Sequence, residues 1–175
     1  MEGSRGLGDV YKRQPQHSDM PASGWWRMLP HSLHRFIYLG RFDRPIGWWL
    51  LLLPGWWVIP VGNTSVPRMW WLMALFLVGA IITRAAGCVI NDLWDRRLDQ
   101  QVERTQQRPL ASGAVSVAGA FIFLSILGAI GVGILWQLPD IAIYVGLAAA
   151  PLVIIYPLAK RITWFPQFFL GLTFS

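Results

Sequence analysis

Residues 69–99 read MWWLMALFLVGAIITRAAGCVINDLWDRRLD, an apolar run that continues directly into a charged one. Its first part, Met69–Ile90, contains a single charged side chain, Arg84. About 20 helical residues cross the hydrocarbon core of a bilayer, so this part is long enough to form a membrane-spanning helix. Aspartates close to a membrane are costly unless they bind a cation, pair with basic groups or line a polar cavity. The stretch therefore predicts a transmembrane helix that ends in a functional charged segment.

Three further apolar segments follow the same pattern. They cover residues 46–61, 115–136 and 141–159, and a fifth segment begins near Phe165. Backbone polar groups find no partner in lipid, so we expect helices here, with Pro54, Pro151 and Pro157 accommodated as kinks. The predicted fold class is all-α, a multi-pass transmembrane helical bundle.

The composition agrees with a membrane protein. Hydrophobic residues make up 54% of the chain and charged residues 14%, against about 25% charged residues in soluble domains. The formal net charge is +6, but the basic residues lie between apolar runs. We therefore expect them to face a lipid bilayer, and we predict no nucleic-acid partner.

Lysine and arginine are distributed unevenly between the connections. They gather before the first apolar segment, after the second and after the fourth, whereas the other two connections offer only Arg68. An alternating path places the basic segments at one end of the bundle. By the positive-inside tendency, that end faces the cytoplasm in a bacterial inner membrane, or the matrix in a mitochondrial inner membrane.

The charged segment presents oxygen ligands on one side of a helix. At about 100° per residue, its amide and three carboxylates fall within roughly a quarter turn. The four residues are Asn91, Asp92, Asp95 and Asp99. Hard cations such as Mg²⁺ take oxygen ligands of this kind together with substrate phosphates. The alternative is a solvated helix end whose aspartates pair with Arg96, Arg97 and Arg104.

Basic residues accompany the acidic ones at the same predicted end. They are Arg84, Arg104, Arg108, Lys160 and Arg161. A metal bridging phosphate oxygens, with arginine and lysine neutralising the remaining charge, suits a diphosphate substrate. Polybasic loops also bind anionic lipid head groups without chemistry, which is the alternative interpretation.

The motif NDLWDRRLD, residues 91–99, resembles the NDxxDxxxD sequence of the UbiA family of intramembrane prenyltransferases. Further stretches are similar, in the same order, to the branch of that family that prenylates 4-hydroxybenzoate. They are RFDRPIGWWLLLLP (41–54), RAAGCVIND (84–92), RPLASGAV (108–115) and YPLAKRITWFPQFFLGLTFS (156–175). The resemblance extends from about Leu33 to Ser175.

This resemblance implies a UbiA-like helical bundle. It further implies Mg²⁺-dependent transfer of a polyprenyl group from polyprenyl diphosphate to the ring of an aromatic acid, 4-hydroxybenzoate, in ubiquinone biosynthesis. Matched by position, Asn91, Asp92, Asp95 and Asp99 become metal ligands, and Asp92, Asp95 and Arg161 catalytic residues. Diphosphate-binding roles fall on Arg84, Asn91, Arg104, Arg108, Lys160 and Arg161. Arg41 and Asp43 match positions assigned to the acceptor side.

The chain is expected to divide into three parts. Residues 1–14, which contain SRGLGDVYKRQ, resemble a translated sequencing adapter and are expected to be an artefact. Residues 15–45 form a juxtamembrane segment, and residues 46–175 a transmembrane prenyltransferase domain. The family has a second Asp-rich motif in a later helix. We therefore expect the chain to be an N-terminal half that is inactive alone.

Two other functions compete with this one. A UbiA-type transferase could use another acceptor, such as haem, dihydroxynaphthoate or a chlorophyll precursor. Outside the enzymes, a membrane transporter could use buried acids to mark an ion pathway.

Overall fold

The computed structural model describes residues 24–62 and 65–162, with side chains described as far as residue 151. Over these ranges the chain is helical between turns and contains no β-strand, which confirms the predicted fold class. The helices are η1 (Trp25–Met28), α2 (His31–Leu39), α3 (Ile46–Val58), η2 (Ile59–Val61), α4 (Val66–Asp99), α5 (Val117–Leu135) and α6 (Asp140–Ile162). The proposed adapter and the fifth apolar segment lie outside the described residues.

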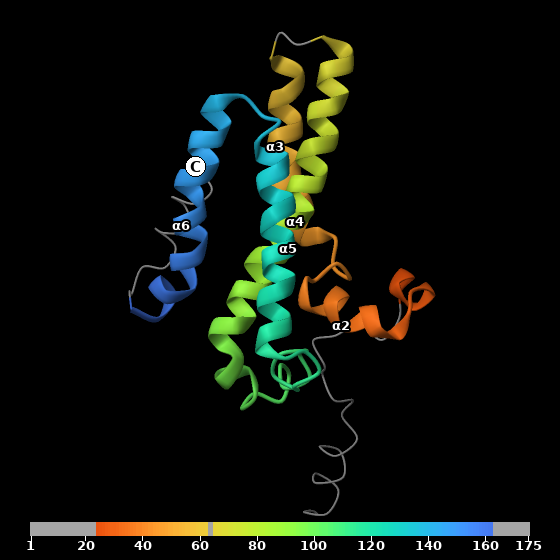
Figure 1. Cartoon of the computed structure of the whole chain (residues 1–175), viewed down its shortest axis with the longest axis vertical. Helices are drawn as coiled ribbons and strands as arrows, with labels where there is room; N and C mark the ends of the chain where they lie inside the picture. The colour runs from red at the N-terminus through yellow and green to blue at the C-terminus, as the bar shows by residue number, and fades with distance from the viewer. Residues whose placement is uncertain (1–23, 63–64, 163–175) are drawn as a thin grey trace, which may run out of the picture.

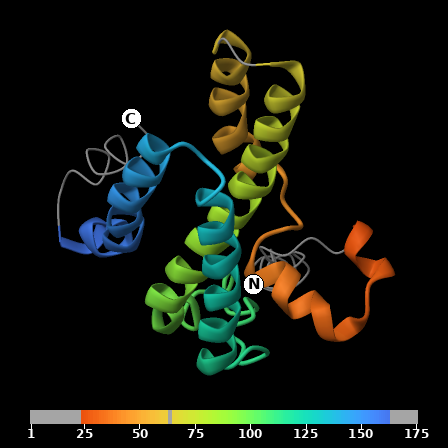
Figure 2. The same cartoon turned by 45° about the horizontal axis from the view of Figure 1, so that its top comes forward.

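The helices α3 to α6 form an up-and-down arrangement (Figure 1). The chain rises through α3, descends through α4, rises through α5 and descends through α6, which lies beside α4 and α5. In both ribbon views α2 projects sideways from this bundle (Figures 1 and 2). The connections before α3 and after α4 therefore lie toward the same end, as the distribution of basic residues predicts.

The long helix α4 carries both the apolar run and the charged segment. Ser65 precedes it as the N-cap residue, and Pro67 lies in its first turn, where the missing proline N–H costs no helical hydrogen bond. The helix then continues through 34 residues. It does not stop at Ile90, so the aspartates belong to the same rigid element as the apolar run.

Helix α3 packs closely against the first half of α4. A Cβ added to Gly55 would lie 2.5 Å from Cδ1 of Phe76, so the glycine makes room for the phenylalanine ring. Nearby, the indole Nε1 of Trp56 donates a hydrogen bond to the carbonyl oxygen of Met73 at 3.0 Å. Pro54 lies within α3, and the helix remains intact around it.

The buried core lies in the half of the molecule that contains the charged segment. Its members come from α2, α4, α5 and the loop between α4 and α5, and they are Leu39, Ala85, Val89, Leu110, Val115, Ala120 and Leu127. Ser116 caps α5, because its hydroxyl accepts a hydrogen bond from the backbone N–H of Gly119 at 3.0 Å. The core therefore fixes the loop of residues 100–116 against the end of α4.

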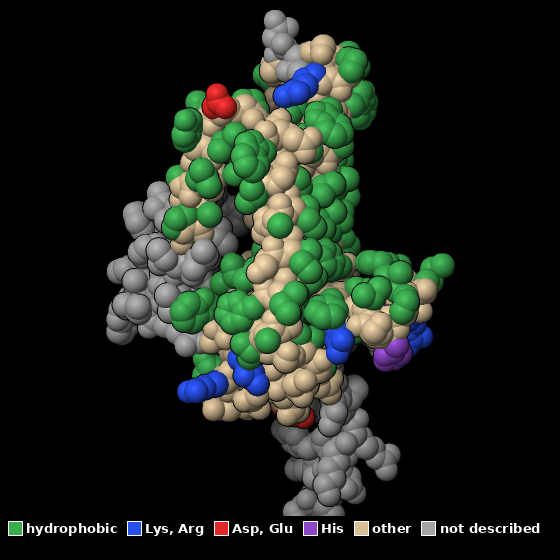
Figure 3. All heavy atoms as spheres, in the orientation of Figure 1, with side chains coloured by type: hydrophobic (Ala, Val, Ile, Leu, Met, Phe, Trp, Pro, Cys, Tyr) green, Lys and Arg blue, Asp and Glu red, His purple; other side chains and the backbone are tan. Residues whose placement is uncertain are grey.

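Outside this core, apolar side chains cover much of the surface (Figure 3). Phe121, Ile122 and Ile126 on α5 are each more than half exposed, and most Lys and Arg side chains on the visible face lie toward the lower end (Figure 3). Helices α4 and α5 are long and apolar enough to cross a membrane. A surface this apolar is suited to lipid rather than to water.

Candidate functional site

Asp92 is the most deeply buried charged residue of the site, with 1% of its surface exposed. Its Oδ1 accepts hydrogen bonds from the guanidinium groups of Arg41, at 3.0 Å, and Arg108, at 3.4 Å. The other oxygen, Oδ2, is buried and has no hydrogen-bond partner within the described parts of the chain. A buried carboxylate needs compensation, and here it receives two arginines from remote segments while retaining one unused acceptor.

Arg108 joins Asp92 to Asp99. Its Nη1 donates to both carboxylate oxygens of Asp99, at 3.1 and 2.9 Å, so one guanidinium links two aspartates that lie two helical turns apart. Thr105 adds a second tie, since its hydroxyl donates to the carbonyl oxygen of Asp99 at 3.1 Å. The last turn of a helix has carbonyls without intrahelical partners, and this bond satisfies one of them.

Arg41 reaches Asp92 from the turn between α2 and α3. Its backbone has φ 55°, the one positive φ at a non-glycine position among the described residues. This left-handed conformation costs about 1 kcal/mol or more for such a residue, and it accompanies an ion pair across 51 positions of sequence. The entry to α3 is therefore anchored directly to the charged segment of α4.

Asp43 lies two residues further along the same turn. Arg44 donates from Nε to its Oδ2 at 3.3 Å, while Oδ1 is buried without a hydrogen-bond partner in the described ranges. Burial raises the pKa of the Asp43 carboxyl above its ordinary value, and the charges of Arg44 and Arg41 offset part of that effect. Asp43 therefore lies in the same turn as Arg41 without joining the Asp92 cluster.

Arg84 lies two turns before the aspartates and is exposed. A Cβ added to Gly47 would lie 2.5 Å from Nε of Arg84, so the start of α3 provides the space that the guanidinium occupies. Neither a hydrogen bond nor an ion pair holds Arg84 in the part of the chain with described side chains. Its charge is available to a ligand.

The other predicted site residues are placed less closely together. Asn91 and Asp95 are half-buried on α4, and Arg104 is exposed on the loop without an ion pair to a described residue. Lys160 and Arg161 belong to the last turn of α6, but their side chains lie outside the description. The structure thus assembles Arg41, Asp92, Asp99 and Arg108 into one cluster.

The donor chemistry of this cluster fits a divalent cation in part. The unused Oδ2 of Asp92 is an acceptor of the kind that Mg²⁺ prefers, and Asn91 and Asp95 offer further oxygens along the same helix. Among the described residues, no three His, Cys, Asp or Glu side chains are grouped closely enough to hold a metal ion. Both oxygens of Asp99 are occupied by Arg108. The set of four metal ligands, Asn91, Asp92, Asp95 and Asp99, stays a prediction. Asp92 is the member of the set that the geometry supports best.

Sequence patterns did not indicate two features of this site. Gly47 shapes the surroundings of Arg84, and Thr105 ties the loop to Asp99. An isolated glycine in an apolar helix can mark a close approach, which was the available signal for Gly47. The bond from Thr105 to a backbone carbonyl leaves no comparable mark in the sequence.

Fold and site together define a helical membrane protein with a charge-compensated acidic segment at one end of a long helix. The sequence profile of the UbiA prenyltransferase family matches residues 51–175. The chain belongs to this family. No solved structure gives a significant match.

Curated relatives carry consistent names. The chain is 45% identical over 149 residues to the rat "4-hydroxybenzoate polyprenyltransferase, mitochondrial". The aligned residues make up 83% of this chain and 39% of the rat protein. It is 41% identical over 169 residues to "4-hydroxybenzoate geranyltransferase 1" of Lithospermum erythrorhizon, covering 95% of this chain and 54% of the relative. The Aedes aegypti mitochondrial polyprenyltransferase is 48% identical over 144 residues, covering 80% of this chain and 32% of that relative. The chain thus spans between about a third and a half of the length of these proteins.

Proposed function

We propose that the whole protein transfers a polyprenyl group from polyprenyl diphosphate to the ring of 4-hydroxybenzoate, a step of ubiquinone biosynthesis. The observation that carries the proposal is Asp92, a carboxylate buried at the charged end of a membrane-length helix with one oxygen unused. The names of the relatives supply the substrates. We further propose that the protein lies in a bacterial or mitochondrial inner membrane, with this end in the cytoplasm or matrix.

The basic residues are proposed to bind the diphosphate. Arg84 is exposed and lacks an ion pair with the described side chains, so it can pair with phosphate oxygens without first breaking a salt bridge. Lys160 and Arg161 follow on the last turn of α6, which descends toward the same end (Figure 1). These cations stabilise the negative charge that develops on the departing diphosphate.

We propose that Mg²⁺ is held by the side-chain oxygens of Asn91, Asp92 and Asp95. When bound, the ion supplies positive charge that stabilises the diphosphate as it leaves. Arg41 and Arg108 both donate hydrogen bonds to Oδ1 of Asp92 and thereby orient its carboxyl group. They leave Oδ2 as the oxygen through which Asp92 acts.

The acceptor is proposed to lie near the turn of residues 40–45. Loss of diphosphate leaves an allylic cation, and the ring carbon ortho to the phenol hydroxyl attacks it before proton loss restores aromaticity. Arg41 and Asp43 come from this turn, and Arg41 is bonded to Asp92. In this proposal, that hydrogen bond connects the acceptor side of the site with its diphosphate side. The apolar prenyl chain can remain between the helices and lipid.

A transfer assay with a matched set of variants tests the proposal. The chain is expressed alone and joined to the C-terminal part of the rat relative, then supplied with a polyprenyl diphosphate and 4-hydroxybenzoate or dihydroxynaphthoate. We expect Mg²⁺-dependent prenylation of 4-hydroxybenzoate by the joined chain and none by the chain alone.

In that assay, Asp92→Ala and Asp95→Ala should each abolish transfer. Removal of one electrostatic group that stabilises a transition state typically costs about 10²–10³-fold in rate. Glu103→Gln is the control, because Glu103 is an exposed acid on the loop that follows α4. Wild-type rates in the Asp92 and Asp95 variants would contradict the assignment of these residues, and preference for dihydroxynaphthoate would contradict the acceptor.

A further inference from the structure

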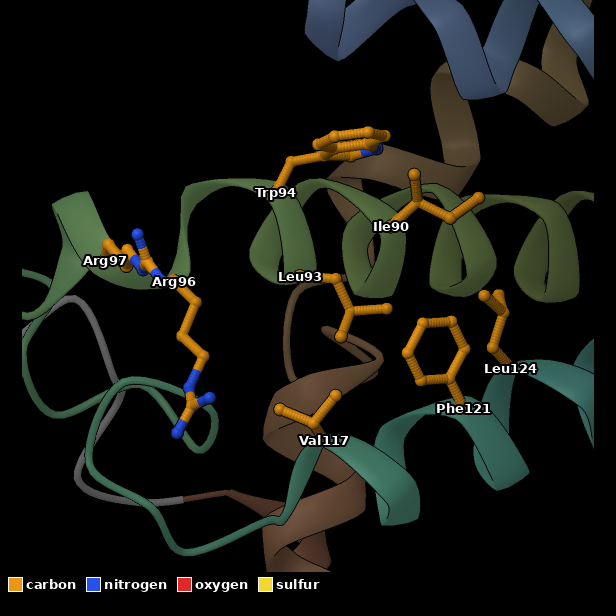
Figure 4. A pocket seen from close by; sticks show the side chains of 8 residues that line it. All are labelled: Ile90, Leu93, Trp94, Arg96, Arg97, Val117, Phe121 and Leu124. Atoms are coloured by element: carbon orange, nitrogen blue, oxygen red, sulfur yellow. The ribbon is translucent and has the colours of Figure 1, made fainter.

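A groove lies beside the charged segment of α4. A cavity of about 530 Å³ opens between α4 and α5, lined by apolar side chains and two arginines. This volume is within the range of ligand sites, about 300–1,000 Å³. In Figure 4, Leu93 of α4 faces Val117, Phe121 and Leu124 of α5. We call this surface the α4–α5 groove.

Most of the groove lies on a different side of α4 from the aspartate cluster. At about 100° per residue, Arg97 lies roughly 140° around α4 from Asp92 and 160° from Asp99, whereas Arg96 lies about 40° from Asp92 and 60° from Asp99 and so borders both surfaces. Arg97 and Leu93 line the groove, whereas Asp92 and Asp99 face Arg41 and Arg108. One helix end therefore presents two different charged surfaces.

The two arginines of the groove have no acidic partner among the residues with described side chains. Arg96 donates from Nε to the carbonyl oxygen of Leu110 at 3.3 Å, and Arg97 is exposed. Arg41, Arg44 and Arg108, by contrast, are all paired with aspartates. The groove thus carries positive charge that no described carboxylate pairs with.

The arrangement of charge and apolar surface favours one ligand chemistry. From Arg97 to Ile90 the groove follows α4 for about 10 Å, with the guanidinium groups at one end and apolar side chains along the rest. Trp94 and Phe121 remain 41% and 55% exposed on its walls. Basic pockets between transmembrane helices at the positively charged membrane face are suited to anionic lipid head groups.

We propose that the α4–α5 groove binds an anionic phospholipid, with its phosphate on Arg96 and Arg97 and an acyl chain against Leu93, Phe121 and Leu124. The lipid would lie between α4 and α5, with its acyl chain on a different side of α4 from Asp92 and Asp99. This assignment is independent of the transfer reaction.

Native mass spectrometry of the full chain tests the proposal. The protein is reconstituted in nanodiscs of equal dioleoyl phosphatidylglycerol and dioleoyl phosphatidylcholine, extracted, and its retained lipids are counted. We expect preferential retention of phosphatidylglycerol. Each arginine near an anionic surface strengthens binding about fivefold, so Arg97→Gln should weaken retention about fivefold and Arg96→Gln/Arg97→Gln about 25-fold.

Two further variants distinguish lipid binding in the groove from non-specific attraction of anionic lipid to positive charge. Arg35→Gln removes an equal charge from an exposed arginine of α2 outside the groove, and it should retain wild-type selectivity. Phe121→Trp narrows the groove with its charges intact and should lower the retention of phosphatidylglycerol. Arg97 has no hydrogen bond within the described chain, so its single variant is expected to fold even if the double variant does not.

Other outcomes would overturn the proposal. Equal retention of both lipids by the wild type would show that the groove does not select anionic head groups. An equal loss in Arg35→Gln would indicate general charge attraction. Displacement of the lipid by a prenyl diphosphate in an Arg97-dependent manner would assign the groove to that substrate, and unchanged retention in Phe121→Trp would place the lipid elsewhere.

Discussion

The last three turns of α4 present two faces that treat charge in opposite ways. On one face, Asp92 and Asp99 are buried and bonded to Arg41 and Arg108, which come from segments remote in the sequence. On the other, Arg97 borders an apolar groove, and Arg96 lies at its edge between the two faces; neither arginine meets a carboxylate in the described structure. The first face is held together by its own charges and supports the fold. The second face carries charge suited to something outside the chain.

Replacing an arginine on each face tests this difference most strongly. Arg108→Gln removes a partner that is 14% exposed and bonded to two aspartates, and breaking a buried ion pair costs about 3 kcal/mol. Arg97→Gln removes an exposed charge and should change the free energy of unfolding by less than about 0.5 kcal/mol. Thermal unfolding in detergent, followed by circular dichroism, measures both. Equal shifts in the two variants would remove the distinction between the faces.

A double-mutant cycle sharpens the result. Asp99→Asn and Arg108→Gln are measured singly and together, and residues in one ion-pair network typically couple by about 0.5–3 kcal/mol. Nη1 of Arg108 contacts both oxygens of Asp99, at 2.9 and 3.1 Å, which predicts a coupling energy within that range. Additive effects would show that the guanidinium of Arg108 does not hold Asp99 in solution.

A smaller effect is expected at Gly47, where α3 makes room for Arg84. In Gly47→Ala the new Cβ would lie 2.5 Å from Nε of Arg84, so the flexible guanidinium must move. We expect the KM for the prenyl diphosphate to rise about tenfold, because losing one hydrogen bond between charged groups costs about 1.5 kcal/mol, with little change in stability. Gly87→Ala is the matched control, because a Cβ there meets nothing within 4 Å. A rise in KM for both variants would trace the effect to the helices rather than to Arg84.

The smallest effect concerns Asp43 and pH. Burial raises the pKa of Asp43 in the folded protein, so the folded state binds the proton more tightly than the unfolded state does. The resulting destabilisation is present above the folded pKa and is lost as the pH falls toward the ordinary value. Asp43→Asn should therefore raise the Tm slightly at pH 7, by about 2 °C, and leave it unchanged at low pH. Asp140→Asn, at an exposed acid, is the control, and a lower Tm for Asp43→Asn at pH 7 would contradict the expectation.

Much of the fold could be predicted from the sequence because membrane-length apolar runs leave few alternatives. The runs at 46–61, 69–90, 115–136 and 141–159 all fall within helices or at their ends, and Ser116 caps α5 as its residue type suggests. The ion pairs were harder to predict. Arg96, Arg97 and Arg104 are near the aspartates in sequence, yet Asp92 pairs with Arg41 and Arg108. Sequence proximity does not determine pairing when a turn and a loop fold back onto a helix.

The unbroken length of α4 has a mechanical consequence. Its 34 residues extend about 51 Å, whereas the hydrocarbon core of a bilayer is about 30 Å thick. With no hinge between its two parts, the helix can adapt to a thinner or thicker membrane by tilting as a rod. Such tilting would raise or lower Asp92 relative to the lipid head groups, so membrane thickness should set the depth at which the aspartates meet a diphosphate.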